Sequence, residues 1–143
     1  MIKIFHSIIF LVALIGNLNA NENPKIEKVV SDFMDALNNN NAELAKGIVM
    51  DDAFLTVVYK KDNRTLKRDI SMNDFISDIE KRTIKVEEKI WNLKINVNEN
   101  IASAWMDYDF HIEGKFSHKG SNVILLTKIN EKWLISHILF DRN

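Results

Sequence analysis

Ionisable side chains alternate with apolar ones along WMDYDFHIEGKFSHKGSN, residues 105–122. One row holds Asp107, Asp109, His111 and Glu113, and the other holds Met106, Tyr108, Phe110 and Ile112. A period of two predicts a β-strand whose two faces differ in polarity. Carboxylates and imidazoles carry general acid–base chemistry, and the same atoms bind metal ions. We expect no metal site, because ligands in a flat row diverge whereas a metal ion needs converging ones.

The register of the following hairpin decides which of these groups meet. Glu113-Gly114 is typical of a two-residue turn. If the turn is strict, Asp109 lies opposite His118 and can fix the tautomer of its imidazole, as in a general base. If a bulge adds one residue, Tyr108 becomes the neighbour of His118 instead, and both arrangements stay open. An Asp–His pair on adjacent strands is most often a surface pair that contributes about 0–1 kcal/mol, so the pattern favours binding over catalysis.

The same strands carry two apolar rows that the strict turn would place on opposite faces. Phe116, Ile124 and Leu126 share the parity of His118, which predicts that this face is the inner one. The strict turn would then leave the row of Tyr108 and Phe110 exposed on the outer face, which is unusual unless something covers it. Either the outer face is a subunit interface, or a bulge places the aromatic row inside.

The first half of the chain shows helical periodicity. One apolar stripe predicts a helix over about residues 23–37, and a shorter helix follows over about 42–49. FLTVVY, residues 54–59, predicts a strand, and Ser71 with Asp74 three residues later predicts a capping box that opens a third helix. We interpret KKDNRTLKR, residues 60–68, as a solvated loop.

From Ile84 onward the pattern predicts four long strands joined by short turns, over about residues 84–97, 101–112, 115–129 and 132–140. The apolar parity changes at Ile90–Trp91, which predicts a bend through a β-bulge. Helices separated from a meander predict an α+β fold, here a cone-shaped, curved antiparallel sheet with three helices on its concave face. The wide end of such a cone is expected to hold an apolar cavity with a few polar groups.

The first twenty residues have the order of a secretory signal peptide. Lys3 precedes an apolar stretch from Ile8 to Ile15, and a short polar tail ends at Ala20. The apolar stretch is shorter than the roughly 20 residues of a membrane span, so we expect cleavage near Ala20 and no stable membrane anchor. We therefore expect an exported protein, periplasmic or secreted, with one domain over residues 21–143.

Composition limits the partners. The chain has no cysteine, which excludes disulfides and thiolate metal sites. Its formal net charge is −1, whereas nucleic-acid binding needs a concentrated basic face. We expect no nucleic-acid partner and no cofactor.

The order of elements, with DDAFL entering the first strand, resembles the nuclear transport factor 2-like superfamily, which includes SnoaL-like cyclases and ketosteroid isomerase. WMDYDF…GKFSHKG…W is similar to a pattern in exported bacterial members of unknown function. The matching positions are Trp105, Tyr108, Phe110, Gly114, Lys115, Phe116, Ser117, His118, Gly120 and Trp133, and Arg142 also fits. The resemblance implies a cone-shaped pocket and a homodimer through the outer sheet face, but no single function.

The mechanism of ketosteroid isomerase does not carry over to this chain. The place of its general base falls at Val57 or Val58, and that of its oxyanion-hole acid falls near Leu125. Valine cannot accept a proton, and leucine cannot donate a hydrogen bond to an enolate.

The sequence thus predicts an exported protein that binds a small apolar or aromatic molecule. The expected ligand-binding residues are Tyr59, Tyr108, Phe110, Phe116, His118 and Trp133. One alternative is a small cofactor-free acid–base enzyme of the isomerase, dehydratase or hydrolase type, using His118 with Asp109 or Tyr108. A further alternative is a dimerising scaffold with a vestigial, filled pocket.

Overall fold

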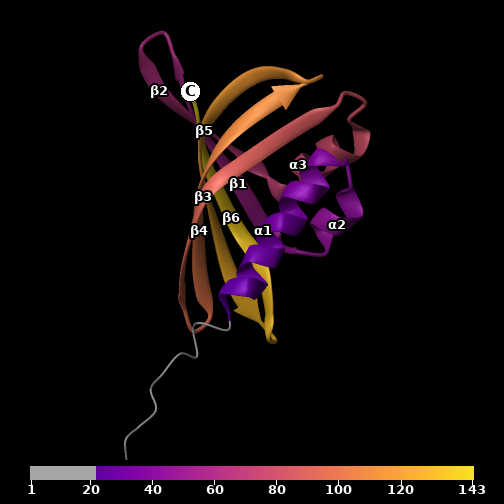
Figure 1. The fold of residues 1–143 in the computed structure, drawn as a ribbon, viewed down its shortest axis with the longest axis vertical. Coiled ribbons are helices and arrows are strands. Elements are labelled where there is room, and N and C mark those ends of the chain that lie inside the picture. The colour runs from indigo at the N-terminus through magenta and orange to yellow at the C-terminus, as the bar shows by residue number, and fades with distance from the viewer. Residues whose placement is uncertain (1–21) are drawn as a thin grey trace, which may run out of the picture.

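A computed structural model describes residues 22–143, so the expected signal peptide lies outside the described residues. Three helices and six strands follow one another in this part of the chain (Figure 1). They are α1 (Asn23–Asn38), α2 (Ala42–Lys46), β1 (Val49–Lys61), β2 (Arg64–Ser71), α3 (Met72–Lys81), β3 (Val86–Asn98), β4 (Ile101–Ile112), β5 (Lys115–Ile129) and β6 (Lys132–Arg142). None of the helices described here is long and apolar enough to cross a membrane.

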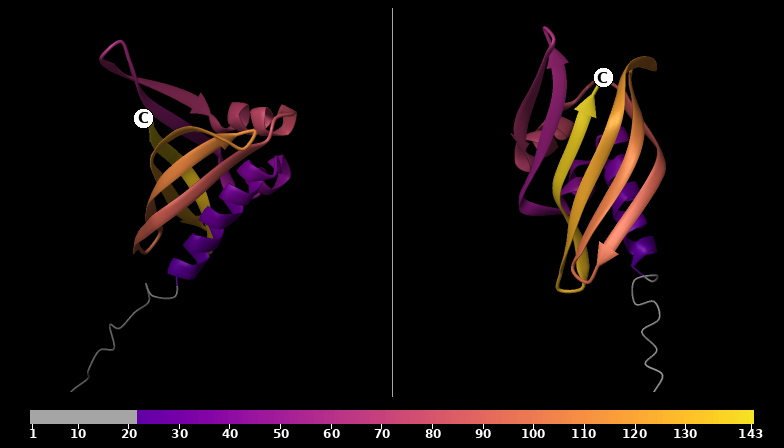
Figure 2. Two further views of the ribbon diagram at one scale, coloured as in Figure 1. Left: turned by 45° about the horizontal axis from the view of Figure 1, so that its top comes forward. Right: turned by 90° about the vertical axis from the view of Figure 1, so that its left-hand side faces the viewer.

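The six strands form one curved, unclosed sheet in the order β2-β1-β6-β5-β4-β3. All neighbouring pairs are antiparallel except β1 and β6, which run parallel. The sheet bends around the helices, and the β1–β2 hairpin projects beyond them (Figure 2). The predicted α+β fold with three helices on the concave face is confirmed.

The basic segment predicted as a loop is instead the tip of that hairpin and most of β2. Asp62 and Asn63 make the two-residue turn with φ of 51° and 60°, the left-handed conformation that such turns require. Strand β2 is an edge strand whose partner lies on one side only, and its charged residues are typical of edges. The prediction of a loop was therefore wrong. Leu66 and Ile70 lie on one face of β2, but the charged residues around them concealed this period of two.

The helices bury one face each against the inner side of the sheet. Helix α1 contacts β3, β4 and β6, whereas α3 contacts β1 and β2. The apolar stripe of α1 is buried as predicted, with Ile26 and Val30 at most 1 % exposed. Ser71 caps α3 as predicted: its hydroxyl accepts from the Asp74 N–H at 3.1 Å and, in place of the second bond of a capping box, donates to the Asp74 carboxylate at 2.7 Å.

Bulges bend the long strands. In β3 the extra residue lies between Trp91, opposite Asp107, and Lys94, opposite Trp105, and Asn92 has a φ of 56°. The parity change therefore follows Trp91, which points to the outer face, rather than preceding it as the apolar pattern had suggested. A bulge of this kind re-aims the side chains that follow it, so Ile95 and Val97 return to the core.

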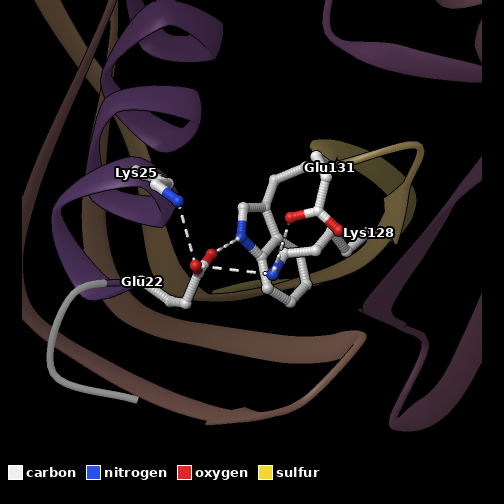
Figure 3. A network of polar contacts seen from close by, with 5 residues as sticks. Glu22, Lys25, Lys128 and Glu131 are labelled. Carbon is white, nitrogen blue, oxygen red and sulfur yellow. Dashed lines mark hydrogen bonds and ion pairs between the residues drawn. The ribbon is translucent and has the colours of Figure 1, made fainter. Parts of the chain in front are cut away.

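A polar network ties the start of α1 to the β5–β6 turn (Figure 3). The Glu22 carboxylate accepts from the Trp133 indole N–H at 2.5 Å and pairs with Lys25 at 2.9 Å and Lys128 at 3.4 Å. These donors lower the pKa of Glu22 to about 2, the indole hydrogen bond having the largest effect. The network thus holds the first turn of α1 against the ends of β5 and β6.

Candidate functional site

A cavity of about 310 Å³ lies between the helices and the inner face of the sheet. Every element except α2 contributes to its wall, and most of the lining side chains are apolar. The apolar lining residues are Phe33, Met34, Leu37, Leu55, Val57, Ile70, Phe75, Phe110, Ile138 and Phe140. This volume is at the lower end of the range for small-molecule sites.

A buried carboxyl group, that of Glu88 on β3, lines the cavity. Its Oε1 accepts a hydrogen bond from the side-chain amide of Asn122, on β5, at 2.6 Å. Burial raises the pKa of Glu88 to about 7, and the Asn122 hydrogen bond opposes this rise only in part. Near neutral pH the group can therefore either accept or donate a proton.

The end of α1 holds Glu88 in place. The Asn38 side chain accepts from the Glu88 N–H at 2.7 Å and donates to the Glu88 carbonyl at 3.1 Å. Strand β3 is an edge strand, so its outward backbone groups lack a strand partner on that side. A side-chain amide offers one donor and one acceptor, which satisfies both groups of one residue. Asn38 thus positions the strand segment that carries the buried carboxyl.

The β4–β5 hairpin has the bulged register. Ile112 faces Lys115 and His111 faces Phe116, but beyond them Phe110 faces His118. Asp109 consequently pairs with Lys119 on the outer face, and the Asp109–His118 dyad of the strict register does not form. Ser117 is the extra residue, and it returns His118 to the same face as Tyr108 and Phe110.

The Tyr108 hydroxyl is engaged in the fold. It donates to the carbonyl of Asp141 at 2.8 Å, and the residue is 1 % exposed. Gly120 lies opposite Tyr108 on β5, where a Cβ would come within 2.1 Å of the Asp141 carbonyl oxygen. Burial and, to a lesser extent, Glu88 raise the pKa of Tyr108 well above its ordinary value. Tyr108 is thus a neutral structural donor rather than a free acid.

His118 lies at the open end of the cavity, against two aromatic rings. Its imidazole stacks on Phe110 with ring centroids 5.0 Å apart and meets the edge of Tyr108 at 5.8 Å. Its Nδ1 lies 3.1 Å from the Ser117 hydroxyl. Burial, followed by the positive charge of Arg142, lowers the pKa of His118 below its ordinary 6.5. The imidazole is therefore neutral at pH 7.

Three arginines also line the cavity. Arg82 is used in the fold, since it donates to the Leu37 carbonyl at 3.1 Å and to the Asn40 side chain at 3.3 Å. Arg68 on β2 and Arg142 on β6 form no ion pair with any carboxylate of residues 22–143. Within the same residues no group of three His, Asp or Glu side chains is arranged to hold a metal ion.

Solved structures resemble this architecture over most of the chain. A crystal structure of an NTF2-like protein of unknown function from Shewanella baltica matches with a TM-score of 0.68 and 17 % identity, covering 90 % of this chain and 98 % of that one. A protein of unknown function with a cystatin-like fold from Nostoc punctiforme matches at 0.68 and 14 %, covering 90 % and 96 %. The chain has an NTF2-like fold. No family model and no curated protein matches the sequence.

A further solved structure that resembles this chain comes from Novosphingobium aromaticivorans and is assigned as the β subunit of an aromatic-ring-hydroxylating dioxygenase. It matches with a TM-score of 0.71 and 12 % identity, covering 89 % of this chain and 92 % of that one. At such identities the likeness shows the fold alone, because this fold hosts unrelated functions. The site must be argued from its own residues.

Within the NTF2-like fold, the predicted ligand-binding residues divide into two groups. Tyr108, Phe110 and His118 line the cavity, whereas Tyr59 lines a neighbouring surface depression that shares His118 and Arg142 with it. Phe116 and Trp133 line neither. The bulge at Ser117 turns Phe116 to the outer side, where it is 58 % exposed and meets the His111 ring at 5.9 Å, and Trp133 belongs to the Glu22 network.

The two positions that correspond to the general base and the oxyanion-hole acid of ketosteroid isomerase lie on different faces of the sheet. Val57 lines the cavity, and Leu125 is 40 % exposed on the outer face. Neither side chain can transfer a proton.

Sequence reasoning missed Glu88, Asn122 and the role of Asn38. A signal for the first two was present, because Glu88 lies between Val86 and Ile90 in the inward row of β3, and Asn122 shares its parity with Ile124 and Leu126. A polar residue at an apolar parity is a candidate for a buried functional group. The contact between Asn38 and Glu88 joins residues 50 positions apart and has no local signal.

Proposed function

We propose that this protein binds a small, largely apolar molecule in the cavity beneath its helices, and that it does so after export. The observation that carries the proposal is an apolar cavity of about 310 Å³ that contains a buried, hydrogen-bonded polar pair, Glu88 and Asn122. Apolar walls provide affinity, and a few placed polar groups orient the bound molecule. The signal-peptide pattern of residues 1–20 supports export.

The direct test is to identify what the cavity contains. Protein purified from its host under native conditions is analysed by native mass spectrometry and by extraction of small molecules. We expect a co-purifying compound with the wild type and none with Val57→Trp, whose indole would occupy the cavity. Val58→Trp is the matched control, because the next residue of the strand points to the outer face. Equal retention by both variants would refute binding in this cavity.

A second candidate function is acid–base catalysis, and the observation that favours it is the state of Glu88. A carboxyl group whose pKa is about 7 is suited to accept and return a proton near neutral pH. The candidate base is therefore Glu88 instead of the Asp109–His118 pair. If a substrate screen finds turnover, Glu88→Gln should lower kcat by about 10²–10⁴-fold. Unchanged turnover in that variant would exclude this mechanism.

We also propose that two copies associate through the outer sheet face. Five large apolar side chains lie on this face and are 38–47 % exposed: Phe54, Trp91, Trp105, Leu125 and Leu139. A depression of about 410 Å³ lies on the same side, between β3 and β6, with Ile101 and Leu125 in its wall. Exposed apolar surface of this kind is typical of interfaces.

A further inference from the structure

The charges lining the cavity are distributed unevenly. Three guanidinium groups and one carboxyl group line it. That carboxyl, Glu88, is partly protonated at neutral pH because burial raises its pKa to about 7. Asn122, which binds it, is 4 % exposed. The interior therefore carries little negative charge, and positive charge remains in the lining.

The two guanidinium groups without an ion-pair partner among residues 22–143 are both exposed: Arg142 lies at the open end, and Arg68 lies on the edge strand β2, level with Phe140. Along the inner row of β6, Arg142 is followed inward by Phe140 and then by Ile138, which is 3 % exposed. Along β5 the order is His118, Gly120, Asn122 and the fully buried Ile124. Arg142 and His118 also border the neighbouring surface depression, which Lys60 and Lys61 line as well. The cavity thus runs from a basic mouth to an apolar interior.

Arg68 and Arg142 line the same cavity from two different strands, β2 and β6. Arg68 faces Val57 on β1, and Tyr59 of the same strand faces Arg142 on β6. The two arginines thus lie on strands two positions apart, about 10 Å across the sheet and about 7 Å along it, with β1 between them. Both side chains line the same cavity, and neither has an ion-pair partner within residues 22–143. A pair of guanidinium groups in this arrangement matches the planar oxygens of a carboxylate.

We propose that the ligand is an apolar carboxylic acid whose carboxylate binds Arg142 and Arg68 at the mouth while its hydrocarbon part fills the interior. This inference rests on the proposed binding function and specifies its ligand class. The opposite orientation would bury the carboxylate beside the Glu88 carboxyl and away from Arg68 and Arg142, and Glu88 would then have to stay protonated. His118 borders the carboxylate position as a neutral imidazole and stacks on Phe110, which forms the wall next to it.

The test compares acids with their neutral isosteres. Decanoate and 2-naphthoate, and the primary amide of each, are titrated calorimetrically into the purified protein. We expect at least one of the acids to bind tenfold or more tightly than its amide. In Arg68→Met/Arg142→Met the difference between acid and amide should fall to less than threefold while the affinity for the amide is retained. Lys94→Met, on the outer face of β3, is the control and should leave both affinities unchanged.

Each result separates the two proposals. Equal binding of acid and amide by the wild-type protein would refute the carboxylate inference and leave cavity binding intact. A preference for the acid that survives in the double arginine variant would also refute it. Binding of no acid and no amide would overturn the proposed binding function together with this inference. Retained affinity for the amide in the double variant shows that its cavity is folded. The comparison of acid with amide in the wild-type protein does not depend on the variant.

Discussion

At the residue scale, the Glu88 carboxyl lies in surroundings that disfavour its charged form. It is desolvated, and only Asn122 donates to it among residues 22–143. A carboxyl whose folded-state pKa is raised binds its proton more tightly in the folded protein than in the unfolded chain. Its contribution to stability is therefore present below about pH 4.5 and is lost as the pH rises to about 7.

The first prediction follows from this linkage. Between about pH 4.5 and about pH 8, ionisation of Glu88 should lower the free energy of unfolding of the wild type by about 3 kcal/mol. Glu88→Gln should lack this part of the decrease. Glutamine retains an acceptor for Asn122 but does not titrate. The measurement is urea denaturation at several pH values for both proteins. Parallel pH profiles would mean that Glu88 is ionised in the folded state at neutral pH.

A second prediction concerns the charge at the mouth of the cavity. Arg142 is the second cause, after burial, of the lowered pKa of His118. Arg142→Met should therefore raise the pKa of His118 while leaving it below 6.5, because burial remains. NMR titration of the imidazole protons measures this, with His137 on the outer face as the internal reference. An unchanged pKa of His118 would place the guanidinium away from the imidazole.

The alternation of residue types predicted the aromatic row of the site but not its polar centre. Tyr108, Phe110 and His118 were identified from their spacing, and two register alternatives remained. Periodicity assigns a side chain to a face, yet it does not tell whether a carboxylate on the inner parity is tolerated there. Glu88 is tolerated because Asn122 and Asn38, distant in sequence, bind its side chain and its backbone.

At the element scale, the β4–β5 hairpin and β6 meet at Gly120. The Tyr108 ring lies opposite this glycine, and its hydroxyl reaches the Asp141 carbonyl on β6. A methyl group on Gly120 would overlap backbone atoms, which cannot move as the end of a flexible side chain can. The missing side chain at Gly120 therefore lets β6 lie close against the β4–β5 hairpin.

The third prediction tests that approach. Gly120→Ala should lower the free energy of unfolding by about 1–3 kcal/mol, the usual cost of overpacking. Gly47→Ala is the matched control, since its Cβ would meet nothing closer than 3.4 Å, and we expect between no change and a gain of about 1 kcal/mol. Chemical denaturation measures both variants. A Gly120→Ala protein as stable as the control would mean that β6 can move away from the hairpin without cost.

Most elements were predictable because their signals are local. The apolar stripe of α1 and the Ser71 capping box each lie within one element. Strand β2 was missed because basic residues occupy positions of both parities in it, and its pairing with β1 depends on the Asp62-Asn63 turn. Such a strand is specified mainly by its partner.

At the scale of the whole molecule, the helices cover one face of the sheet and leave the other open (Figure 2). The curved sheet could be predicted from the long strands and the parity change near Trp91. The parallel pairing of β1 with β6 could not, because it joins segments separated by most of the chain. That pairing places β1 and β2, with Arg68, beside the cavity.

The open face determines the fourth prediction. Trp105 is 47 % exposed on β4, with Trp91 at 42 % on the adjacent strand. If the outer faces of two copies pack together, a stable interface buries about 800 Å² on each, and a carboxylate placed within it loses its hydration. Trp105→Glu should therefore weaken the dimer at least tenfold, whereas Ile84→Glu, which is exposed before β3 begins, should not. Sedimentation over a range of concentrations measures the mass. A wild-type monomer, or a Trp105→Glu dimer of unchanged affinity, would place the interface elsewhere or exclude it.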